Sequence, residues 1–133
     1  MTHDGVLSPI GGSPYADGRT APCWVEISPD GRYLFAVNTG STDVSSYRIL
    51  TDGSLQLQGT TAFRSGAGIR PFDARFNPGG KDLYVVDAAL AAISAFAVGG
   101  GSLTELDRSP FSLPAGAKPF GIVVTGSNEE QDR

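Results

Sequence analysis

The stretch PCWVEISPDGRYLFAVN, residues 22–38, decides the fold, because the chain repeats its pattern as PFDARFNPGGKDLYVVD at residues 71–87. A third copy begins as PFGIVV at residues 119–124. The copies start at Pro22, Pro71 and Pro119, so the period is 49 and then 48 residues. A near-constant period of this length is the sequence signature of a repeat architecture.

Each complete unit contains four strand-like segments, which in the first unit are residues 23–27, 33–38, 44–50 and 55–63. Gly31 and Gly53 lie between them, where a tight hairpin requires positive φ. Four short strands in a period of about 40–50 residues are typical of a β-propeller blade. We therefore predict an all-β fold built from four-stranded antiparallel β-propeller blades. A β-sandwich is the alternative fold, and we rank it behind the propeller because a sandwich does not explain a constant repeat length.

The repeat also predicts how the chain is divided. Residues 1–21 are expected to form the tail of a preceding blade, because Ser8-Pro9-Ile10 resembles Ser109-Pro110-Phe111. We predict one blade at 22–70, a second at 71–118, the first strand of a further blade at 119–125 and a disordered tail at 126–133.

The second strand of each unit is apolar on both faces, as in LFAV at residues 34–37 and LYVV at 83–86. Such strands are buried between two neighbouring sheets. Two blades cannot supply a neighbour on both outer faces, and repeat stacks need about three or more units and protected ends. We therefore predict a partial ring or a ring completed by an oligomer, in which copies of the chain contact one another head to tail.

Composition narrows the classes of partner, compartment and cofactor. The chain has 133 residues and a net charge of −4 without a basic cluster, which argues against nucleic acid or an anionic membrane as partner. It has no apolar run long enough for a signal peptide or a membrane span, which favours the cytoplasm. One cysteine, Cys23, and one histidine, His3, give no metal-ligand pattern, so neither a metal nor a cofactor is expected.

The blade sequence resembles a known family. The stretch SPDGRYLFAVNTGSTDVSSYRI at residues 28–49, followed by TDGSL at 51–55, is similar to blades of the lactonase family of seven-bladed β-propellers. That family includes 6-phosphogluconolactonase and carboxy-muconate lactonising enzymes. The resemblance covers Pro22 to Val124 well and implies that this chain supplies about two blades of such a ring.

The resemblance implies a reaction less directly than a fold. The family's enzymes resemble one another at Pro-Arg-His leading into a first strand and at Asn-Glu ending a second strand. Here the first place reads Pro71-Phe72-Asp73 and the second reads Asn38-Thr39 or Asp87-Ala88, without the histidine or the glutamate. Whether the chain is an enzyme therefore stays open at this point.

The residues that lead into and line the first strands are the candidates for a functional site, because these strands surround the central channel of a propeller. Arg70 and Arg75 could stabilise a developing oxyanion, with Asp73 as the nearby base. Two interpretations remain for Arg75. It can pair with Glu26, one repeat earlier on the adjacent inner strand, or help to form an anion-binding mouth; we favour the ion pair. The catalytic candidates are Arg70, Asp73 and Arg75, and the substrate-binding candidates are Arg19, Trp24 and Lys118.

Two functions follow from these observations. The first is a lactonase-like propeller that hydrolyses a sugar lactone such as 6-phosphogluconolactone, or acts on a related small carboxylate. The alternative is a non-catalytic propeller module that binds a ligand or a protein, since one fold hosts many functions. The expected partner is a small anionic or sugar-lactone ligand.

Overall fold

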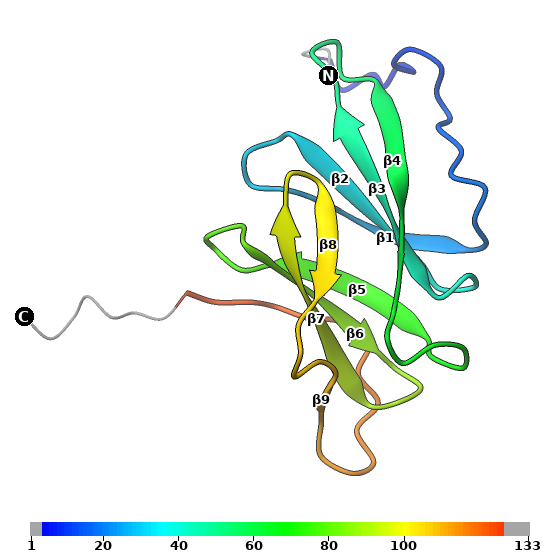
Figure 1. Ribbon diagram of the computed structural model, residues 1–133. Helices are drawn as coiled ribbons and strands as arrows, with labels where there is room; N and C mark the ends of the chain where they lie inside the picture. The colour runs from blue at the N-terminus through cyan, green and yellow to red at the C-terminus, as the bar shows by residue number, and fades with distance from the viewer. Residues whose placement is uncertain (1–3, 127–133) are drawn as a thin grey trace, which may run out of the picture.

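The computed structural model describes residues 4–126, which form two antiparallel sheets in chain order (Figure 1). The first blade pairs its four strands in the order β1 (Pro22–Ile27), β2 (Tyr33–Asn38), β3 (Asp43–Ile49) and β4 (Leu55–Ala62). The second pairs β5 (Pro71–Phe76), β6 (Asp82–Asp87), β7 (Ala92–Gly99) and β8 (Ser102–Glu105) in the same way. The predicted all-β fold of four-stranded propeller blades is confirmed, with the ring left open. No residue in 4–126 is helical, so this part of the chain holds no helix that could span a membrane.

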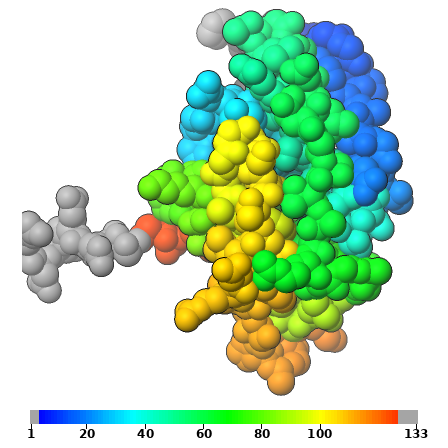
Figure 2. All heavy atoms as spheres, in the orientation of Figure 1, coloured from blue at the N-terminus to red at the C-terminus, as the bar shows by residue number. Residues whose placement is uncertain are grey.

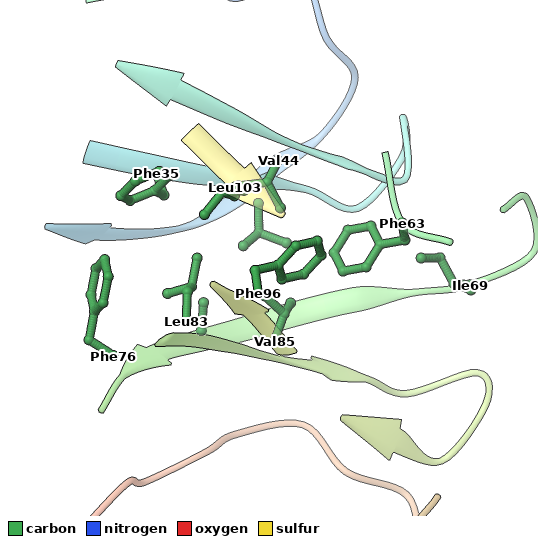
Figure 3. Packing of buried hydrophobic residues seen from close by; sticks show 11 residues of the cluster. Phe35, Val44, Phe63, Ile69, Phe76, Leu83, Val85, Phe96 and Leu103 are labelled. Atoms are coloured by element: carbon green, nitrogen blue, oxygen red, sulfur yellow. The ribbon is translucent and has the colours of Figure 1, made fainter. Parts of the chain in front are cut away.

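The two blades pack face to face around one apolar core. Phe35 and Val37 of β2 are fully buried against the second blade, which contributes Leu83 and Val85 from β6. Figure 3 shows the paired rings of this core, with Phe63 and Phe96 at one end and Phe35 and Phe76 at the other. Burial on this face follows from the alternation of the strands, because every second side chain points to the neighbouring sheet.

The outer faces of the pair are only partly covered. Val25 and Ile27, on the face of β1 that points away from the second blade, are 60% and 52% exposed. Part of this face is covered by the N-terminal segment, where Tyr15 lies beside Leu34 and Tyr47, and Figure 2 shows that segment in dark blue along the flank of the first blade. The apolar exposure expected for blades without neighbours is therefore present.

The outer strand of the second blade is broken in two. Residues 106–110 leave the sheet after β8, and the chain returns to β7 as the two-residue strand β9 (Phe111–Ser112). The turn before it carries a hydrogen bond from Ser109 N to Leu106 O at 3.0 Å. Ser13 N donates to Ile10 O at 3.1 Å in the same pattern. The counterpart of Ser109-Pro110 is therefore Ser13-Pro14, five residues later than the match that the sequence indicated.

The third copy of the repeat forms no strand in the structure. Residues 119–124 run beside the second blade, where Ile122 N donates to Asp73 Oδ2 at 3.1 Å. A first strand pairs with the second strand of its own blade, and no such strand follows within the described residues. The tail expected at 126–133 lies outside the described residues except for Gly126.

Candidate functional site

One end of both blades gathers the loops that lead into the first strands. These loops, residues 17–21 and 63–70, lie beside the turns that follow the second strands, residues 39–42 and 88–91, and together they are called the mouth end. Thr39 N donates to Ala21 O at 2.9 Å in the first blade, and Ala88 N donates to Arg70 O at 3.0 Å in the second. Thr39 Oγ1 also donates to Pro71 O at 2.6 Å, which ties the two blades together. The mouth end is thus a continuous surface.

Arg70 lies at the mouth end against a group of aromatic rings. Its guanidinium carbon is 5.8 Å from the centre of the Phe72 ring, a distance at which cation and ring attract. Phe72 is 4.7 Å from Phe120, and Phe120 meets Trp24 edge-on at 6.0 Å. We call Trp24, Phe72 and Phe120 the aromatic cluster. It joins first-strand residues of both blades to the third copy of the repeat, and it gives the mouth end an apolar aromatic surface with a cation beside it.

The aromatic cluster has one polar group without a partner. Trp24 packs partly against the core, and its indole Nε1 is buried with no hydrogen-bond partner among the described residues. Phe120 is 59% exposed, so the cluster is reached from solvent. An aromatic surface with an adjacent guanidinium suits a ligand with a ring and an anionic group.

Asp73 and Arg75 lie further along β5 and bond to each other. Arg75 Nη1 is 2.7 Å from Asp73 Oδ1 and 3.4 Å from Glu26 Oε2. The ion pair expected between Glu26 and Arg75 is therefore present. Asp73 is 5% exposed, and its carboxylate oxygens also accept hydrogen bonds from the backbone N–H groups of Ala74 and Ile122. This group joins the inner strands of the two blades and the segment that follows them, and Asp73 has no oxygen left free to act as a base.

The two predicted arginines are thus separated. Arg75 follows Arg70 by five positions in the chain, which is roughly 16 Å at the rise of an extended strand. Arg70 belongs to the mouth end, and Arg75 belongs to the wall formed by the first strands.

Glu26 gives the wall a dependence on pH. Burial raises the pKa of its carboxyl above 4.5, and the nearby Arg75 charge offsets this only in part. The folded chain therefore holds this proton more tightly than the unfolded chain. The resulting stability is fully present below pH 4.5 and is lost as the pH rises through the higher folded pKa.

We expect Glu26→Gln to flatten this part of the stability profile, since an amide does not titrate. Urea midpoints measured at pH 4, 5, 6 and 7 check it. Asp30→Asn is the control with the opposite sign, because the Ser28 hydroxyl and Arg32 N hold the pKa of the Asp30 carboxyl below 3.8. Asp30→Asn should change the dependence of the urea midpoint on pH only at acid pH, where the Asp30 carboxyl titrates. Parallel profiles for Glu26→Gln and the parent chain would contradict the assignment.

Arg19, in the 17–21 loop of the mouth end, is held in a polar network of the first blade. Its guanidinium forms an ion pair with Asp43, and the Asp43 carboxylate also accepts a hydrogen bond from Asn38 Nδ2 at 2.8 Å. Ser45 Oγ accepts a hydrogen bond from Asn38 Nδ2 at 2.8 Å and donates one to Asp17 Oδ2 at 2.7 Å. Burial works to raise the pKa of Asp17, but the hydrogen bonds from Ser45 and Arg19 N outweigh it and leave that pKa below 3.8. The network fastens the N-terminal segment to the blade.

The structure therefore divides the six predicted residues. Arg70 contacts the Phe72 ring and Trp24 contacts the Phe120 ring, so both lie at the aromatic cluster. Asp73 and Arg75 lie in the wall, and Arg19 is paired with Asp43. Lys118 is exposed just before the third copy of the repeat. Sequence reasoning missed Phe72 and Phe120 as site residues. Both follow the proline that opens a repeat, so their shared position was the available signal. Within residues 4–126, no group of three or more His, Cys, Asp or Glu side chains is placed to hold a metal.

Comparison with known proteins identifies similar folds. The sequence pattern of the family described as "Lactonase, 7-bladed beta-propeller" matches residues 2–123. No curated protein sequence matches the chain. Among solved structures, a putative 6-phosphogluconolactonase from Bacteroides fragilis is 27% identical with a TM-score of 0.64, over 74% of this chain and 27% of that chain. The periplasmic gluconolactonase PpgL of Pseudomonas aeruginosa is 30% identical with a TM-score of 0.59, over 72% of this chain and 27% of that chain.

A protein from Lactobacillus plantarum is similar as well, at 25% identity and a TM-score of 0.62, over 68% of this chain and 28% of that chain. This chain spans less than a third of the length of each of these three structures. The similarity therefore covers a minor part of each ring.

Proposed function

This chain belongs to the lactonase family of seven-bladed β-propellers, and we propose that it contributes two blades to a propeller that hydrolyses an anionic sugar lactone such as 6-phosphogluconolactone. Two similar structures support a sugar lactone as substrate, because one is named a putative 6-phosphogluconolactonase and the other a gluconolactonase, and the first of these names an anionic lactone. The observation that carries the proposal is the Arg70 guanidinium over Phe72 at the mouth end.

The proposed chemistry is the opening of a lactone ring by water. Water adds to the carbonyl carbon, negative charge develops on the carbonyl oxygen, and the bond from that carbon to the ring oxygen then breaks, which leaves a hydroxy acid. A guanidinium stays charged at neutral pH and binds a phosphate or carboxylate through two parallel N–H groups. We assign to Arg70 the binding of the anionic group of the substrate, with the sugar ring against the aromatic cluster.

The general base is not assigned to Asp73. Its side chain is buried and already accepts hydrogen bonds from Arg75, Ala74 N and Ile122 N. A base at that position would have to break these contacts before it could reach a water molecule. We propose that Asp73 and Arg75 hold the wall together instead, and that Lys118 adds positive charge at the rim.

Arg70→Ala is expected to lower kcat/KM for 6-phosphogluconolactone about 100-fold, because it removes the charge-assisted hydrogen bonds to the anionic group of the substrate. Hydrolysis by the 133-residue chain, followed as acid release, measures it. Arg32→Ala is the control, since Arg32 is an exposed arginine in the turn at the opposite end of the blade. Equal rates for Arg70→Ala and the parent chain would refute the assignment of Arg70.

A second candidate function is a non-catalytic module that binds a sugar acid at the same place. The engagement of Asp73 and the lack of the family's histidine and glutamate favour it. A rise in melting temperature with 6-phosphogluconate, without turnover of the lactone, would distinguish this function from the first.

The cytoplasmic location and the ring completed by copies of the chain stay predictions. PpgL, which shares the fold, is named a periplasmic protein. The native mass measured by light scattering decides the oligomeric state, and a folded monomer would exclude the ring of copies.

A further inference from the structure

Asp87, the last residue of β6, is bonded to the backbone of the mouth end. It is 1% exposed, and its Oδ1 accepts three N–H groups: Arg70 N at 3.1 Å, Ala89 N at 3.0 Å and Leu90 N at 3.2 Å. Ala88 N in turn donates to Arg70 O at 3.0 Å. Both the N–H and the C=O of Arg70 are therefore fixed to the end of β6.

The first blade shows what this position does without an arginine. Asn38 takes the place of Asp87, and Ala21 takes the place of Arg70, each 49 residues earlier in the chain. The bond from Thr39 N to Ala21 O is kept at 2.9 Å. The Asn38 amide, however, donates to Asp43 and Ser45 rather than holding the residue before the strand. The blade fold thus needs the backbone bond at this position and does not need a carboxylate.

Burial of a carboxylate that accepts backbone hydrogen bonds carries a large desolvation cost. Asp87 Oδ2 is buried and has no partner among the described residues. A charged acceptor makes hydrogen bonds roughly twice as strong as a neutral one, whereas burial of a charge is costly. The carboxylate is present in the blade whose mouth carries Arg70, and a neutral amide is present in the blade whose mouth carries Ala21.

We propose that Asp87 is the positioning residue of Arg70: it fixes the Arg70 backbone so that the guanidinium stays over Phe72, where it can receive an anion. The part of this proposal that concerns the anion rests on the proposed function. The part that concerns the position of Arg70 does not.

Three variants test the proposal. Asp87→Ala removes the acceptor, and Asp87→Asn keeps an oxygen for the same N–H groups. Asp82→Ala is the control, because Asp82 lies at the opposite end of β6 and accepts a hydrogen bond from Asn77 Nδ2 at 2.9 Å. If Asp87→Ala does not fold, Asp87→Asn carries both measurements below, and a ring-current shift and a Kd equal to those of the parent chain would then overturn the proposal.

The first measurement does not need a ligand. We expect the protons of the Arg70 side chain that lie over the Phe72 ring to be shifted upfield by its ring current. We expect Asp87→Ala to lose this shift, Asp87→Asn to keep most of it and Asp82→Ala to leave it unchanged. An unchanged shift in a folded Asp87→Ala chain would overturn the proposal.

The second measurement is the Kd of 6-phosphogluconate by titration calorimetry. We expect Asp87→Ala to weaken binding about tenfold and Asp87→Asn about threefold, and tenfold corresponds to ~1.4 kcal/mol. In an Arg70→Ala background, Asp87→Ala should have no further effect, because a positioning residue acts through the group that it positions. Equal weakening in both backgrounds would refute the proposal. If the parent chain does not bind 6-phosphogluconate, the proposed function fails, and the ring-current measurement alone decides the role of Asp87.

Discussion

Replacing Phe96 by alanine is expected to destabilise the chain by about 3–5 kcal/mol, the range for removing a buried phenylalanine from a core. Phe96 of β7 is fully buried between the two blades. Its ring meets Phe63 edge-on at 5.3 Å, and Figure 3 shows both rings between the sheets. The substitution leaves a cavity in the apolar core between the two blades, and the surrounding strands can relax into it only in part.

The loss is large relative to the stability of a small domain, which is about 5–15 kcal/mol. Urea unfolding followed by Trp24 fluorescence measures it, and the midpoint should fall while the slope with urea stays the same. Phe111→Ala is the matched control, because Phe111 of β9 is 43% exposed and should cost about 1 kcal/mol or less. Similar losses for the two variants would contradict the packing described for the interface between the blades.

Replacing Arg64 by alanine is expected to destabilise the chain by about 2–4 kcal/mol, since it removes several hydrogen bonds from a charged donor. Arg64 lies in the link between the blades and reaches the broken outer strand of the second one. Its Nη1 donates to the carbonyl oxygens of Leu106, Asp107 and Ser109 at 3.1, 3.1 and 3.2 Å, and its Nη2 donates to Glu105 O at 3.2 Å.

Three of these carbonyl groups, those of Leu106, Asp107 and Ser109, lie in the break between β8 and β9, and Glu105 O lies at the end of β8. The guanidinium therefore replaces the strand pairing that the break removes. Lysine has one compact charge and cannot present the same planar set of donors, so Arg64→Lys should recover less than half of the loss.

Thermal and urea unfolding of both variants check this expectation. Arg32→Ala is the control, since an exposed arginine in a turn should change the stability by about 0.5 kcal/mol or less. Unfolding of Arg64→Ala at the same urea concentration as the parent chain would show that these bonds add nothing to stability.

The architecture was predictable from residues that repeat. The 49-residue period from Pro22 to Pro71 predicts the two blades. The apolar runs 34–37 and 83–86 predict a strand in the interior of each blade. The pairing of Glu26 with Arg75 was also predictable, because equivalent positions on adjacent inner strands face each other across the blades. These features depend on local hairpins and on the alternation of side chains, which the sequence specifies directly.

The site was less predictable. Arg70 and Arg75 look alike in the sequence, yet one lies at the mouth and the other in the wall. Asp87 lies at the end of a strand, as a turn aspartate would, and only the tertiary structure shows that it accepts a hydrogen bond from Arg70 N. In the N-terminal segment two Ser-Pro pairs compete as the counterpart of Ser109-Pro110, and the turn at Ser13 decides between them.

The sequence by itself determined the all-β blade architecture, its period and the faces that must be buried, because each of these follows from residue spacing along one strand or hairpin. Only the tertiary structure decided which charged groups are paired, which aromatic rings meet and which arginine stands at the mouth. Those contacts join residues from different copies of the repeat, such as Trp24 and Phe120, and the distances between them depend on how the blades pack.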